Sequence, residues 1–122
     1  MKRTAFLAIL FAAALTACDN RPAEPAVEDL SRASEVDISV PPDGAKIDAK
    51  AEIKLVYGIT LGGEGDHAHL YVDDRRIAML RQMKGSYMIF PLDPGIREIC
   101  IKVVNSNHTP IGVSRCVKVT VG

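Results

Sequence analysis

The chain has 122 residues, enough for one domain, with 15 basic and 15 acidic side chains and no tryptophan. A balanced charge of this kind gives no electrostatic attraction for phosphate backbones and argues against a nucleic-acid partner. The apolar run at residues 5–15 has eleven residues, about half of the roughly 20 that a membrane-spanning helix needs. We therefore do not expect this run to cross a bilayer.

The N-terminal segment has the features of an export signal. Lys2 and Arg3 precede the apolar run, and small residues follow it. The sequence Leu15-Thr16-Ala17-Cys18 resembles the lipobox of bacterial lipoproteins. The resemblance implies cleavage before Cys18, a diacylglycerol on its sulfur and acylation of the new amine, and several acyl chains anchor a protein firmly. The alternative is that residues 5–15 form a short buried helix.

The expected location is the cell envelope, with the domain facing the periplasm and held on the lipid bilayer through Cys18. Asp19 follows this cysteine and, by analogy with enterobacterial sorting, slightly favours the inner membrane. Removal of the signal at residues 1–17 takes away Lys2 and Arg3 and leaves 13 basic against 15 acidic residues. Residues 18–35 are rich in proline, alanine and charge, which predicts a disordered, flexible tether.

From residue 36 to residue 122, apolar residues alternate with polar ones as they do in half-buried strands. We expect seven strands, at residues 36–40, 53–59, 67–72, 76–80, 87–92, 96–104 and 113–121. Turn residues separate them, and no helical pattern is present. The predicted fold class is therefore all-β, a small Ig-like antiparallel β-sandwich.

The two cysteines after Cys18 are expected to form a disulfide. If the last two strands form a hairpin around a loop at residues 105–112, Cys100 and Cys116 lie opposite each other on the polar face. Directly opposed side chains have Cβ atoms about 4.5–5.5 Å apart, and a modest adjustment reaches the roughly 3.8 Å of a disulfide. The alternatives are metal-binding or redox-active thiols, although no CxxC motif is present.

All three histidines are expected at one corner of one sheet. His67 and His69 are two residues apart on a strand, so they share the face opposite Ala68 and Leu70. His108 lies in the loop of the last hairpin, which in Ig-like topology lies at the same end as the loop before the third strand. Three imidazoles are a suitable ligand set for zinc or copper. The alternative is that these histidines are only solvated surface groups.

Neighbouring residues offer candidate additional ligands. Oxygen atoms are available from Asp66, Tyr71 and Asp73, and thioether sulfur, which suits Cu(I), from Met79, Met83 and Met88. The methionines equally fit packing in the core or at its rim.

Three stretches resemble a group of uncharacterised bacterial secreted and lipoprotein domains. Residues 65–73 match a G-x-H-x-H-x-x-x-D strand, residues 92–95 an L-x-P-G turn, and residues 107–112 a late H-x-P hairpin loop. The resemblance covers residues 36–122 and implies the fold and the shared histidines, but no activity. Where the group usually has a further histidine in the sixth strand, this chain has Arg97 or Glu98.

Two functions are consistent with these features. The first is a lipid-tethered domain that binds copper or zinc through His67, His69 and His108. The second is a non-enzymatic module that docks a periplasmic or envelope protein by strand addition, without a metal. We do not expect an enzyme, because the chain has no nucleophile motif such as G-x-S-x-G. The carboxylates of Asp73 and Asp74 are expected on opposite faces of a strand, which separates them as an acid–base pair.

Overall fold

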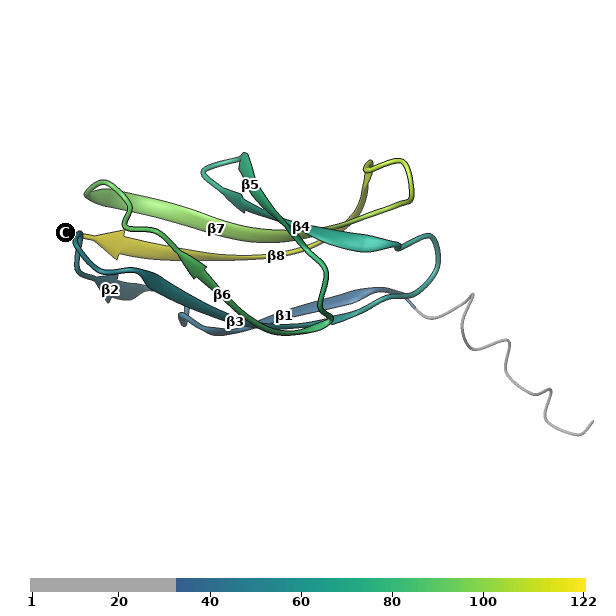
Figure 1. Cartoon of the computed structure of the whole chain (residues 1–122), viewed down its shortest axis with the longest axis horizontal. Helices are drawn as coiled ribbons and strands as arrows, with labels where there is room; N and C mark the ends of the chain where they lie inside the picture. The colour runs from purple at the N-terminus through teal and green to yellow at the C-terminus, as the bar shows by residue number, and fades with distance from the viewer. Residues whose placement is uncertain (1–32) are drawn as a thin grey trace, which may run out of the picture.

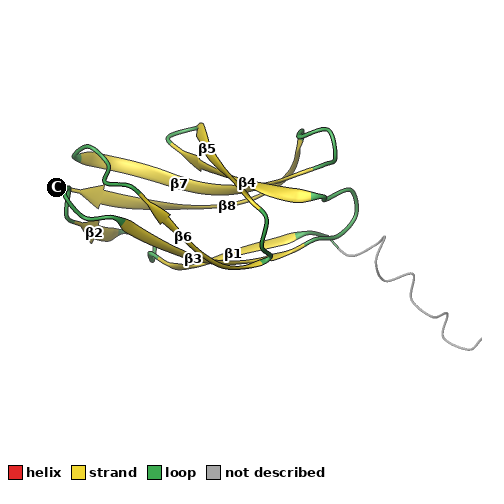
Figure 2. Cartoon of the chain, viewed as in Figure 1, coloured by secondary structure: helices red, strands yellow, loops and turns green. Residues whose placement is uncertain are grey.

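The computed structural model describes residues 33–122, so the expected signal, the expected lipidation site Cys18 and most of the expected tether lie outside the described range. Within this range the chain forms eight strands and no helix (Figure 2). The strands are β1 (Glu35–Val40), β2 (Ala45–Ile47), β3 (Ile53–Thr60), β4 (His67–Val72), β5 (Arg75–Leu80), β6 (Lys84–Ile89), β7 (Gly95–Val104) and β8 (Pro110–Val121). None of residues 33–122 belongs to a helix able to cross a membrane.

The strands form two facing layers (Figure 1). The smaller sheet has the order β1-β3-β6, and the larger has the order β2-β8-β7-β4-β5. Apolar side chains at alternate positions meet between the layers, as the period-two pattern predicts. The largest fully buried side chains of this core are Leu55, Leu70, Ile89, Ile99, Ile101, Val103 and Val119. The predicted all-β sandwich is confirmed.

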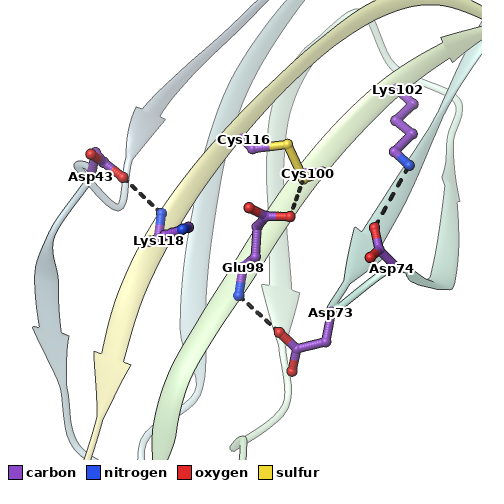
Figure 3. The surroundings of a disulfide bond; sticks show 8 residues. All are labelled: Asp43, Asp73, Asp74, Glu98, Cys100, Lys102, Cys116 and Lys118. Atoms are coloured by element: carbon purple, nitrogen blue, oxygen red, sulfur yellow. Dashed lines mark hydrogen bonds and ion pairs between the residues drawn. A yellow bond between two sulfur atoms is a disulfide. The ribbon is translucent and has the colours of Figure 1, made fainter.

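One strand was not predicted. The three residues of β2 pair in parallel with the end of β8, so the sandwich is not wholly antiparallel. The turn before β2 is attached to β8 at Lys118: the Lys118 amide donates to Asp43 Oδ1 at 2.8 Å (Figure 3), and the Gly44 amide donates to the Lys118 carbonyl at 2.7 Å. A strand this short gives too few residues for an alternation pattern.

The strand expected at residues 87–92 is displaced. β6 covers Lys84–Ile89, and its first residues pair with β3, Lys84 opposite Gly58 and Gly85 opposite Tyr57. β6 is an edge strand of its sheet, where polar residues are common. Hydrophobic alternation therefore placed this strand too late in the chain.

A two-residue turn joins β4 and β5. Asp73 has φ 49° and Asp74 has φ 64°, and two positive φ values are typical of the type I′ hairpin turn. The expectation that these carboxylates project from opposite faces of a strand is wrong, because both residues form the turn. Asp73 accepts a hydrogen bond from the Glu98 amide and one from Arg97, both at 2.9 Å (Figure 3 shows the first). The Glu98 amide, and then Arg97, lower the pKa of the Asp73 carboxyl.

β7 and β8 form the expected hairpin in the expected register. Cys100 pairs with Cys116, and a disulfide joins them with a Cα–Cα distance of 4.1 Å (Figure 3). Cys100 is buried and Cys116 is exposed on the outer face of the larger sheet. Glu98 Oε1 lies 3.6 Å from Cys100 Sγ; because a disulfide sulfur has no proton to donate, this is a packing contact. Neither cysteine offers a thiolate to a metal in this structure.

Candidate metal centre

β4 carries two of the three histidines on the outer face of the larger sheet. It lies between β5 and β7, and the intervening Ala68 and Leu70 are fully buried in the core. The side chains of His67 and His69 therefore project outward, as predicted. His69 is nevertheless only 1% exposed, with the ring centroids of His67 and His108 at 4.8 and 5.3 Å from its own. His69 is therefore not a solvated surface group, which was the alternative interpretation of the histidines.

The loop before β4 is held closely against the start of β1. Ser34 Oγ donates to the Gly62 carbonyl at 2.8 Å and accepts from the Gly62 amide at 2.9 Å. Gly65 fits under this contact only because it lacks a side chain, since a Cβ there would lie 2.5 Å from Ser34 Oγ. The Asp66 amide then donates to the Val104 carbonyl at 2.8 Å. These contacts fix the position at which β4 begins.

A compact loop at residues 105–109 carries His108. This loop between β7 and β8 lies at the end of the sandwich where β4 begins (Figure 1). Asn105 Oδ1 accepts hydrogen bonds from the Asn107 and Thr109 amides at 2.9 and 3.0 Å. The Asn105 carbonyl accepts from the His108 amide at 3.0 Å. His108 itself has φ 62°, a conformation uncommon outside glycine. Asn105 is the site residue that sequence reasoning missed, although asparagine is typical of such turns.

Three ring nitrogens, one from each histidine, meet at one point. His67 Nε2 lies 3.0 Å from His69 Nε2 and 3.1 Å from His108 Nδ1, and the remaining pair is 3.3 Å apart. Nitrogens that each bind one tetrahedral Zn²⁺ at roughly 2.0–2.1 Å lie about 3.3 Å from one another. The spacing of the three nitrogens therefore corresponds to one face of a tetrahedral metal site.

No placement of protons on the three neutral rings makes all three nitrogen–nitrogen contacts hydrogen bonds. The Asp66 carboxylate only accepts hydrogen bonds, so His67 Nδ1, 2.8 Å away, donates to it. In a neutral ring this leaves a lone pair on His67 Nε2. N–H groups of His69 and His108 can both point at this lone pair, but they then face each other at 3.3 Å. A metal cation removes the conflict because it accepts a lone pair from each nitrogen.

Asp66 acts on the cluster through His67. A carboxylate that accepts the second N–H of a ligating histidine fixes the ring and its tautomer and increases the basicity of the other nitrogen. The 2.8 Å contact between Asp66 Oδ2 and His67 Nδ1 has this arrangement. Asp66 was one of three candidate oxygen ligands; in the structure its carboxylate contacts His67.

Burial favours the neutral form of His69. The pKa of its imidazole is lowered first by burial and then by electrostatic interaction with His67, Arg76 and His108. A neutral imidazole is the form that binds a metal. His69 is therefore prepared to act as a ligand at neutral pH.

Most of the other candidate ligands lie away from the three nitrogens. Asp73 belongs to the β4–β5 turn, and Tyr71 has its ring centroid 6.4 Å from that of His69, with Lys102 Nζ 4.6 Å from the Tyr71 ring. Met83 packs against the core, and Met88 lies on β6 in the opposite sheet. Met79 alone of the three methionines pairs with a histidine of the cluster, His69.

A separate groove lies between the two sheets at β1 and β8. Its volume is about 700 Å³, and it is lined by residues 34–37, 58–60, 84 and 113–115. Among residues 33–122, β1 pairs only with β3, and β8 pairs with β2 only at Val119–Val121. Both strands therefore present an edge with no strand partner along part of their length.

The fold and the histidines together define an Ig-like, fibronectin(III)-like β domain with a three-histidine cluster. Among solved structures, the fibronectin(III)-like modules of Clostridium thermocellum CbhA match it with a TM-score of 0.59 and 19% identity, over 70% of this chain and 93% of that chain. An engineered protein matches with a TM-score of 0.50 and 14% identity, over 73% of this chain and 20% of that chain. No protein-family model and no curated protein sequence matches the chain. At these identities the likeness shows the fold alone, and the motif-based resemblance to a lipoprotein group stays a prediction.

Proposed function

We propose that this protein is a lipid-anchored envelope domain that binds one transition-metal ion, copper or zinc, through His67, His69 and His108. The observation that supports the proposal is the approach of three ring nitrogens to within 3.0–3.3 Å of one another. The fixed backbone on both sides of the cluster means that little ordering is needed when the metal binds. Low ordering cost is the usual source of affinity in a preorganised site.

The function we infer is capture of a metal ion near the membrane surface, without catalysis. Ser34 contacts the loop before β4, so the tether joins the domain at the end that carries the histidines. The segment from Cys18 to Ser34 has 17 residues, and the 16 steps between their Cα atoms reach at most roughly 55 Å when the segment is fully extended. A lipid on Cys18 would therefore keep the metal site close to the bilayer.

The metal proposal is tested by titrating the detergent-purified protein with Zn²⁺ and with Cu²⁺ while following heat and chelator competition. One equivalent should bind, with a dissociation constant tighter than about 10 μM, which corresponds to about −6.8 kcal/mol. A protein with all three histidines replaced by alanine should lose this binding. Affinity weaker than that limit for both metals would rule out the proposed site.

The anchor proposal rests on the lipobox-like residues 15–18. Bacteria that express the chain with radiolabelled palmitate should incorporate the label into this protein. The Cys18→Ser variant should be unlabelled and should keep its signal, because lipidation precedes cleavage at such motifs. Equal labelling of both proteins would contradict an anchor at Cys18.

The second candidate function is docking of an envelope protein in the groove between β1 and β8. The partner-free strand edges there favour strand addition, in which an extended segment pairs with a sheet edge. Cross-linking in cells through a photoreactive residue at Ser114, which lines the groove, should capture a defined partner that survives replacement of all three histidines. Absence of any specific product at Ser114, against a control at Lys50, would reject docking at this groove.

A further inference from the structure

The two strands beside β4 place one residue each directly opposite His69. Lys102 on β7 and Met79 on β5 are its cross-strand partners. Directly opposed side chains project from the same face with Cβ atoms about 4.5–5.5 Å apart. An ammonium has no lone pair for a metal, and Lys102 Nζ lies 3.9 Å from Asp74 Oδ1 and over the Tyr71 ring. Met79 is the partner that offers an unshared electron pair.

Met79 is not part of the hydrophobic core. The next residue, Leu80, is 2% exposed and belongs to the core, whereas Met79 is 41% exposed on the outer face. Its thioether sulfur is two bonds beyond Cβ on a chain with three rotatable bonds, which allows the side chain to reach across to a neighbouring group. Met83, by comparison, packs against the core. Met79 therefore lies outside the core on the face that carries the histidines, and its length allows it to reach toward the cluster.

We propose that Met79 supplies a thioether as the fourth ligand of the three-histidine site and gives the site a preference for Cu(I). This inference rests on the proposed metal function and adds a ligand and an oxidation state to it. His108 approaches β4 from the hairpin of β7 and β8, and Met79 lies on the other side of β4, on β5. The sulfur would complete the coordination from the side of the sheet that contributes no histidine.

The choice of metal follows from the softness of the ligand. Thioether sulfur is a neutral, polarisable donor that binds Cu(I) well and adds little for Zn²⁺.

The test compares Met79→Leu with a matched control, Met88→Leu, on the opposite sheet. Both changes keep side-chain size and hydrophobicity, and Met88 is also exposed, at 49%. The proteins are purified in detergent, any free thiol is blocked with N-ethylmaleimide, and Cu(I) is supplied under argon as its bicinchoninate complex. Zn²⁺ affinity is measured separately by competition with a chromophoric chelator.

Met79→Leu should lower Cu(I) affinity by at least about tenfold and leave Zn²⁺ affinity within about twofold, since only the soft donor is lost. Met88→Leu should change neither. X-ray absorption of the Cu(I) protein should show a sulfur neighbour of copper in the wild type and in Met88→Leu, but not in Met79→Leu. Wild-type Cu(I) affinity in Met79→Leu would overturn the role of Met79 and leave the histidine site intact. Failure of the unaltered protein to bind either metal would instead remove the proposed function itself.

Discussion

Replacement of His69 by alanine is expected to weaken binding of Zn²⁺ or copper by at least about 100-fold. Loss of a residue that only supports a metal ligand typically costs about 10–100-fold, and loss of a ligand should cost at least the upper end of that range. His69 Nε2 lies within 3.3 Å of both partner nitrogens, so its removal leaves two imidazoles that no longer enclose the metal. The measurement is chelator competition at pH 7.5.

The buried position of His69 requires a second variant, because alanine there also leaves a small cavity. His108 is exposed and lies in a loop at φ 62°, a conformation that asparagine tolerates. His108→Asn should therefore keep the thermal stability of the metal-free protein while it loses metal affinity by a similar factor. Wild-type affinity in both His69→Ala and His108→Asn would show that the metal binds elsewhere.

The convergence of the histidines was predictable because two simple rules combine. Strand periodicity places His67 and His69 on one face, and the topology of Ig-like sandwiches brings the last hairpin loop to the same end. The hairpin register followed from centring the last two strands on the loop at residues 105–112, and the observed pairing of Cys100 with Cys116 agrees with it. These features depend on patterns that extend over several residues.

The sequence did not reveal which methionine, or which oxygen, lies near the cluster. Met79, Met83 and Met88 were equivalent until the pairing of β4 with β5 was known, and that pairing contains an irregularity between Leu70 and Tyr71. The role of Asp66 as a partner of His67 depends on side-chain rotamers that no periodicity encodes. β2 was missed for a related reason, since its position depends on Asp43 and Lys118, which are far apart in the chain.

The disulfide is expected to contribute about 3 kcal/mol to the free energy of unfolding. It joins residues 16 apart, and a closed loop of about this length restricts the unfolded chain by roughly that amount in the chain-entropy model. The double variant Cys100→Ala/Cys116→Ala avoids leaving one free thiol. Its unfolding midpoint in urea should fall, and the slope of the transition should rise because the denatured chain without the cross-link is less compact and exposes more surface.

The unaltered protein in a reducing buffer is the matched control, because reduction removes the bond without changing any side-chain carbon. The free energy of unfolding should fall by a similar amount in both samples, and a decrease below about 1 kcal/mol in each would contradict the entropic argument.

Loss of the disulfide should affect the stability of the fold more than the geometry of the metal site. Residues 105–109 are held by the hydrogen bonds of Asn105, so His108 keeps its position while the hairpin remains paired. Metal affinity should therefore be unchanged in the fraction of the double variant that is folded, and metal binding should in turn raise its unfolding midpoint, as expected for a ligand that binds only the native state.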